Sequence, residues 1–116
     1  MRQFSIGVNL TPNTKTTLYT VPTKHIAEWS LLYAHNGTSS AKNFSAWWYD
    51  SSANIEIPIV YNYPLAAADY LKFDGGAYIL LEEDDQIRVQ IETGATNASC
   101  IVTLDLIPQL SDIKHN

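Results

Sequence analysis

The feature of this sequence that most constrains its fold is the alternation of apolar and polar residues with a period of two. Residues 87–91, with the letters I-R-V-Q-I, carry the clearest example. Successive side chains of a β-strand point to opposite faces, so this pattern predicts a half-buried strand. The same alternation predicts strands over residues 4–10 and 55–59, and an apolar stretch over 100–107 predicts a strand covered on both faces. Weaker signals predict further strands over residues 16–20, 44–49, 70–73 and 77–81.

Residues 25–35 are ambiguous on local propensity alone. The segment HIAEWSLLYAH could form an amphipathic helix, but its neighbours are strands and it ends at Asn36-Gly37, a turn signal. We therefore interpret it as a strand. Pro58 lies inside another predicted strand, and because proline has no N–H to donate, it predicts an edge strand or a bulge there.

The spacing of the strands indicates the architecture. Clusters rich in Asn, Asp, Gly and Ser separate the strands at short intervals. About eight or nine short strands at this spacing predict an all-β fold, an antiparallel β-sandwich that is jelly-roll-like. The chain of 116 residues has room for a single domain, residues 1–116, and we expect residues 110–116 to form a flexible tail.

Composition excludes several classes of function. The net charge is −5, and the 7 Lys and Arg residues are scattered, whereas binding to phosphate needs clustered cations, so we expect no nucleic-acid partner. No apolar run approaches the ~18 residues of a membrane span, so we expect no membrane partner. The first residues lack the apolar core of a signal peptide, which predicts synthesis in the cytoplasm.

No set of residues in the sequence resembles a catalytic or metal site. His25 and His35 lie at opposite ends of one predicted strand, more than about 30 Å apart, and cannot share a ligand. The acidic run over residues 82–85 lacks the ligand spacing of a calcium loop, and we interpret it as a solvated turn. Cys100, the single cysteine, falls at a core position of its strand, where a thiol behaves as a small apolar group. We expect no enzymatic activity, no cofactor and no bound metal.

The aromatic residues are the most informative about surfaces. Trp47 and Trp48 are adjacent, so on a strand their side chains point to opposite faces, and one can fill the core while the other needs a cover or faces solvent. Exposed aromatic residues on a β-sandwich suit either a protein interface or stacking against a sugar. The candidate interface residues are Trp47, Trp48, Tyr61 and Tyr63.

Two stretches carry a resemblance to a known family. Residues 16–23 (TTLYTVPT) precede an apolar strand that ends at Asn36-Gly37-Thr38, and residues 76–89 (GAYILLEEDDQIRV) form a strand, an acidic turn and a strand. In this order they resemble small β-sandwich structural proteins of tailed bacteriophages, in which a T-x-L-Y-T-V-P stretch precedes a strand and an L-x-x-G-D-x-I-x-V hairpin follows. The resemblance covers residues 15–107. This chain has Asp84 where the family pattern has Gly.

The resemblance implies a virion component that decorates or cements a capsid or serves in a neck, tail or fibre assembly, without indicating which. Our main hypothesis is a capsid decoration or cement subunit. Such a subunit is expected to form a homo-oligomer, for example a trimer, and to bind other virion proteins such as the major capsid protein. Two alternatives stay open. One is a position in the neck, tail or fibre of the particle, and the other is a receptor- or glycan-binding module that uses exposed aromatic residues.

Overall fold

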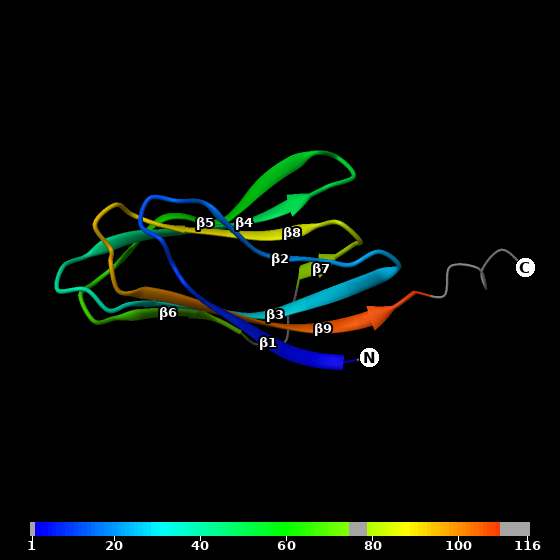
Figure 1. Cartoon of the computed structure of the whole chain (residues 1–116), viewed down its shortest axis with the longest axis horizontal. Coiled ribbons are helices and arrows are strands. Elements are labelled where there is room, and N and C mark those ends of the chain that lie inside the picture. The colour runs from blue at the N-terminus through cyan, green and yellow to red at the C-terminus, as the bar shows by residue number, and fades with distance from the viewer. Residues whose placement is uncertain (1, 75–78, 110–116) are drawn as a thin grey trace, which may run out of the picture.

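The computed structural model describes residues 2–74 and 79–109, which form two β-sheets packed face to face (Figure 1). The strands are β1 (Arg2–Asn9), β2 (Thr16–Thr20), β3 (His25–Asn36), β4 (Lys42–Asp50), β5 (Ile55–Leu65), β6 (Tyr70–Phe73), β7 (Ile79–Leu81), β8 (Gln86–Ile91) and β9 (Ala98–Pro108). Sheet I contains β1, β9, β3, β6 and β7, and sheet II contains β2, β8, β4 and β5. All of these strand pairs are antiparallel, which confirms the predicted all-β sandwich.

The order of the strands is that of a jelly roll. β4 pairs with β5, β3 with β6 and β7, β2 with β8, and β1 with β9, so each pair encloses the previous one along the sequence. Successive pairs alternate between the sheets, and β9 lies between β1 and β3 while β8 lies between β2 and β4. Nested antiparallel pairs shared between two sheets are the jelly-roll arrangement. The predicted jelly-roll-like topology is therefore confirmed.

The strand boundaries agree with most of the sequence predictions. The ambiguous segment over 25–35 is β3, a strand of 12 residues. The strand predicted over 55–59 continues to Leu65, because its second half pairs with the first residues of β4. Residues 77–78 of the strand predicted over 77–81 lie outside the described residues, and so does the tail predicted over 110–116.

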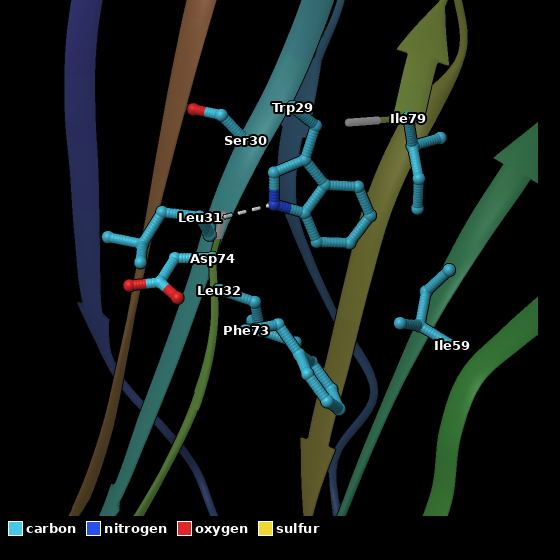
Figure 2. Close-up of a pocket in the computed structure, with 8 residues that line it drawn as sticks. All are labelled: Trp29, Ser30, Leu31, Leu32, Ile59, Phe73, Asp74 and Ile79. Atoms are coloured by element: carbon cyan, nitrogen blue, oxygen red, sulfur yellow. Dashed lines mark hydrogen bonds between the residues drawn. The ribbon is translucent and has the colours of Figure 1, made fainter. Parts of the chain in front are cut away.

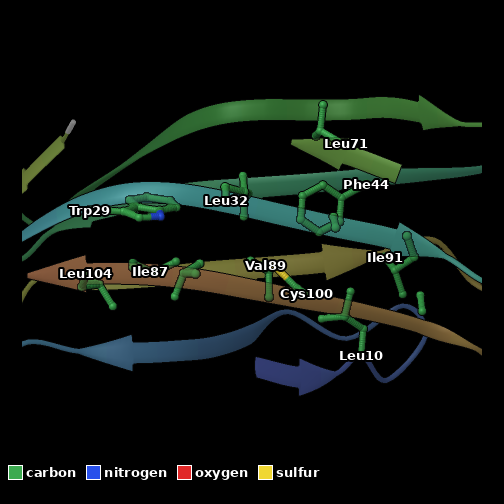
Figure 3. Close-up of a cluster of buried hydrophobic side chains, with 14 of the residues drawn as sticks. Leu10, Trp29, Leu32, Phe44, Leu71, Ile87, Val89, Ile91, Cys100 and Leu104 are labelled. Atoms are coloured by element: carbon green, nitrogen blue, oxygen red, sulfur yellow. The ribbon is translucent and has the colours of Figure 1, made fainter. Parts of the chain in front are cut away.

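The core lies between the two sheets and is built from alternate residues of each strand (Figure 3). Burial of a side chain the size of Val, Leu or Ile contributes roughly 1.5–3 kcal/mol, so the period-two pattern supplies much of the stability. The prediction that the last strand is covered on both faces is wrong. Ile101, on the outer face of β9, is 38% exposed because no second layer of described residues covers sheet I there. The buried residues of β8 and β9 are Ile87, Val89, Ile91, Cys100, Val102 and Leu104.

β5 is an edge strand of sheet II and contains the irregularity predicted from Pro58. Among the described strands it pairs with β4 alone. The register shifts between Phe44 and Ala46 and again between Ala46 and Trp47, so β5 carries extra residues opposite these positions. Bulges of this kind increase the local twist, and the β4–β5 hairpin rises away from the rest of its layer in Figure 1. The prediction of an edge strand with a bulge is confirmed.

Candidate functional site

The structure separates the four aromatic residues predicted to form an interface. Tyr61 and Tyr63 are exposed, with 67% and 43% of their surface accessible. Trp48 packs against the core and donates a hydrogen bond of 3.2 Å from its indole N–H to the Asp85 carboxylate. Trp47 points to the outer face of sheet II, yet it is only 7% exposed. One tryptophan thus fills the core and the other has a cover, which leaves the two tyrosines as the accessible members of the set.

An ion-pair network covers Trp47 on the outer face of sheet II. Glu56 accepts hydrogen bonds from Lys15 at 2.7 Å and from Arg88 at 3.0 Å. The Lys15 ammonium lies 4.0 Å from the centroid of the Trp47 ring, and the Arg88 guanidinium carbon lies 3.9 Å from the centroid of the Tyr49 ring. Burial opposes the ionisation of Glu56, but the hydrogen bonds and charges of the two cations outweigh it. The pKa of the Glu56 carboxyl therefore lies below its ordinary value.

A polar depression lies beside Trp47 on the same face. Its lining comes from β4, β5, β8 and two loops, and its volume is about 220 Å³. Trp47 and Tyr61 both line it, so the structure brings together two of the four predicted residues and leaves Trp48 and Tyr63 outside. The sequence analysis missed the polar residues of this depression, which include Asn13, Asn43, Ser45, Asn62, Gln90 and Glu92.

A second depression is an apolar opening at the edge of the sandwich, between β5 of sheet II and β6 and β7 of sheet I (Figure 2). Its volume is about 340 Å³, and Ile59, Phe73 and Ile79 surround the Trp29 ring. The indole N–H of Trp29 donates to the Leu31 carbonyl at 2.9 Å, which holds the ring in place. Phe73 is 41% exposed, so apolar surface at this edge reaches the solvent.

Asp85, in the turn between β7 and β8, organises one end of the sandwich. Its side chain is 1% exposed, and besides Trp48 it accepts hydrogen bonds from the Glu82 N–H at 2.9 Å and from the Ser51 N–H and hydroxyl at 3.0 and 3.2 Å. The interpretation of residues 82–85 as a solvated turn is therefore wrong at Asp85. The turn exists, but this carboxylate is the acceptor that joins it to the β4–β5 turn.

Asn36 has the corresponding role at the opposite end. It is fully buried, and its amide donates to the carbonyls of Ser40, Leu65 and Ala66, while its side-chain oxygen accepts from Thr38. These bonds join the β3–β4 loop to the β5–β6 loop. Asn36 and Asp85 both belong to the motifs that carry the bacteriophage resemblance, so in this chain those motif positions hold the turns together.

Among residues 2–74 and 79–109, no group of three or more His, Cys, Asp and Glu side chains could hold a metal ion. Burial raises the pKa of the Cys100 thiol to about 12, so it stays protonated at neutral pH. His25 and His35 lie at the two ends of β3. Within the part of the chain that the structure describes, no helix is long and apolar enough to span a membrane.

Comparison with known proteins gives a weak structural similarity. No protein-family model matches the chain, and no curated protein matches it. Among solved structures, the chain is similar to a chain in the structure of infectious bursal disease virus Gt strain, with a TM-score of 0.28 and 9% sequence identity. The match covers 100% of this chain and 42% of the viral chain, so this chain spans less than half the length of that one. That virus is not a bacteriophage, and membership of a bacteriophage family stays a prediction.

Proposed function

We propose that this chain is a structural protein of a bacteriophage virion, a capsid decoration or cement subunit that acts through protein–protein contacts. It forms a homo-oligomer, for example a trimer, and docks on other virion proteins such as the major capsid protein. Its role involves no enzymatic step, cofactor, nucleic acid or membrane. The motif resemblance over residues 15–107 supports this proposal, and so does the jelly-roll topology, which is common among viral capsid domains.

The observation that carries the proposal is the apolar character of the edge strand β5. Ile55, Ile57 and Tyr63 are 47%, 39% and 43% exposed. Glu56 is the single charged residue of this strand, and its charge is compensated by the two cations described above. Natural proteins protect an edge strand with charged residues, prolines, bulges or a short length. The two prolines and the bulges of β5 protect its backbone, but they leave apolar side chains exposed along a strand of 11 residues. An apolar edge of this length favours burial against another protein surface.

The prolines and bulges of β5 determine how such a contact forms. Pro58 and Pro64 have no N–H to donate, and the bulges distort the ladder, so β5 cannot extend a regular sheet into another subunit. The contact therefore packs side chains. The same strand leads through Ile59 to the apolar opening around Trp29 and Phe73, which adds area toward the ~1,200–2,000 Å² of a stable interface. We assign this surface to a second copy of the chain, because closed homo-oligomers are the commonest soluble assemblies.

The solution mass, measured by light scattering on a sizing column, tests the homo-oligomer. The wild type is expected at a multiple of its 13.0 kDa subunit mass, three subunits for the trimer. Ile57→Lys places a charge in the proposed interface and is expected to shift the protein to the monomer. Ile101→Lys is the matched control, since Ile101 is 38% exposed against 39% for Ile57 and lies on the outer face of sheet I.

Two results would contradict the proposed oligomer. One is a wild type that stays monomeric across the micromolar range. The other is an equal response of the mass to the substitutions at positions 57 and 101. A monomeric wild type would favour the alternative of a neck, tail or fibre component that assembles only with its partner.

A further inference from the structure

The polar depression beside Trp47 is distinct from the apolar edge and has its own chemistry. Asn43 and Ser45 reach it from β4, Tyr61 and Asn62 from β5, and Asn13 from the loop before β2. Three backbone contacts fix its rim. The Asn13 N–H donates to the Ile91 carbonyl at 2.9 Å, the Asn62 N–H donates to the Ser45 hydroxyl at 2.9 Å, and the Asn43 N–H donates to the Glu92 carboxylate at 2.7 Å. The depression is therefore a preformed feature of sheet II.

The side-chain amides around this depression have free hydrogen-bonding capacity. Within the described residues, the carboxamides of Asn13, Asn43, Asn62 and Gln90 form no hydrogen bond to another side chain or to the backbone, in contrast to the fully engaged amide of Asn36 described above. Each free carboxamide offers two N–H donors and an acceptor oxygen. All four residues line one depression of about 220 Å³.

Trp47, which also lines the depression, has a donor that is unpaired within the described residues. The indole N–H groups of Trp29 and Trp48 each have an acceptor, whereas that of Trp47 has none among the described residues. Every wholly buried side-chain nitrogen and oxygen in the described part of the chain has a partner, so the Trp47 N–H must be reached by solvent. A tryptophan that is only 7% exposed normally has its N–H paired. This donor is available to a ligand oxygen.

Tyr61 supplies a flat apolar surface at the rim, with 67% of its area accessible. The nearby cations are already engaged, since Lys15 binds Glu56 and Lys42 donates to the Thr93 carbonyl at 3.2 Å. An anionic ligand such as a phosphate would require free cations, and an apolar ligand would leave the carboxamides without partners. An aromatic ring beside four carboxamides, with the Glu92 carboxylate already accepting from the Asn43 N–H, suits a ligand ring that carries hydroxyl groups on its edge and C–H groups on its face.

We propose that this depression is a carbohydrate-binding subsite that takes a single pyranose-sized unit of a glycan. Tyr61 stacks against one face of the sugar ring, and the carboxamides of Asn13, Asn62 and Gln90, with the Trp47 N–H, bind its hydroxyl groups. The volume lies below the ~300–1,000 Å³ of sites that enclose drug-sized ligands, which fits one sugar unit with the rest of the glycan in solvent. Ile55, Ile57 and the apolar opening do not line this subsite, although Tyr61 and Asn62 belong to the same strand as the proposed interface.

Two-dimensional ¹H–¹⁵N NMR titration of the full chain tests the subsite. The probes are glucose, galactose, mannose, rhamnose and N-acetylglucosamine, together with short oligosaccharides of each. At least one probe is expected to bind with a millimolar dissociation constant and to shift the Trp47 indole signal and the side-chain amide signals of Asn13, Asn62 and Gln90. The indole signals of Trp29 and Trp48 serve as internal references and should stay in place.

Two substitutions separate stacking from general surface effects. Tyr61→Ala removes the aromatic ring that stacks on the sugar, and it is expected to weaken binding by about tenfold or more, the equivalent of ~1.4 kcal/mol. Tyr70→Ala is the matched control, since Tyr70 is an exposed tyrosine of β6 in sheet I that lines neither depression, and it should leave the affinity within about twofold. The amide spectrum of each variant verifies that it is folded. The proposal is overturned if no probe shifts the Trp47 signal, or if the two tyrosine variants lose affinity equally.

Discussion

The Asp85→Asn variant replaces a buried carboxylate with a carboxamide of the same shape, and so tests whether this residue holds one end of the sandwich. In the native chain one carboxylate oxygen accepts from the Ser51 N–H and hydroxyl, and the other accepts from the Glu82 N–H and the Trp48 indole. All of these partners are donors in the native arrangement. A carboxamide has one acceptor oxygen, so it cannot satisfy them all.

The size of the effect follows from these bonds. The less costly orientation points the new NH₂ group at Ser51, whose hydroxyl can turn to accept from it, while the Ser51 N–H loses its acceptor at a cost of about 1–3 kcal/mol. The bonds from Trp48 and Glu82 persist without the charge and weaken by roughly 1 kcal/mol each. Relief of the desolvation of a buried charge offsets part of this loss. We expect a net loss of about 2–4 kcal/mol, or about 8–16 °C in Tm for a domain of this size.

The assay is urea unfolding followed by far-UV circular dichroism and tryptophan fluorescence at one fixed protein concentration, because oligomers gain stability with concentration. Asp84→Asn is the matched control. Asp84 is exposed and has a φ of 70°, a conformation that asparagine adopts readily, so this substitution should change stability by less than about 0.5 kcal/mol. An Asp85→Asn protein that unfolds at the same urea concentration as Asp84→Asn would refute the role assigned to Asp85.

Two further substitutions test other parts of the structure. Gly37→Ala should cost about 1–3 kcal/mol in urea unfolding, because its Cβ would lie 2.5 Å from the Asn97 carbonyl oxygen, whereas Gly7→Ala, with its closest contact at 3.5 Å, should be nearly neutral. Equal effects at the two glycines would contradict this steric reason. Glu56→Gln should cost up to about 1 kcal/mol at neutral pH, since exposed ion pairs contribute roughly 0.2–1 kcal/mol each. Because the folded-state pKa of Glu56 is lowered, its contribution is present above the unfolded-state pKa and is lost as the pH falls through the folded-state pKa. The difference between wild type and Glu56→Gln in urea unfolding should therefore disappear in acid, and a difference that persists there would argue against the charge.

The strands of this fold could be predicted from the sequence because their signals are local. The alternation over residues 87–91 marks β8, and Pro58 marks an edge strand, since both depend on a residue and its immediate neighbours. The partners of each strand could not be read in this way. β1 pairs with β9, which lies near the other end of the sequence, and no local pattern indicates this pairing.

In the candidate site, too, some features could be predicted from local sequence and others could not. The opposite orientations of Trp47 and Trp48 follow from their adjacency alone, but the cover over Trp47 comes from Lys15, which is brought there by the β2–β8 pairing. Asp85 lies in a run of acidic residues that suggests solvent exposure, and its burial depends on donors from the β4–β5 turn. The side-chain amides of the polar depression follow no sequence motif, since they come from three strands and one loop.

The central position of β9 in sheet I has a consequence for how the chain folds during synthesis. β1 and β3 leave the ribosome early, yet they become neighbours of one strand that is made last, and β8 joins β2 to β4 in the same way. Pairings this distant in sequence form slowly. Until β8 and β9 are made, the earlier strands expose apolar faces that favour aggregation. A nascent chain that stops before Ala98 leaves β1 without its strand partner. The sandwich therefore cannot be completed until β8 and β9 have both been synthesised.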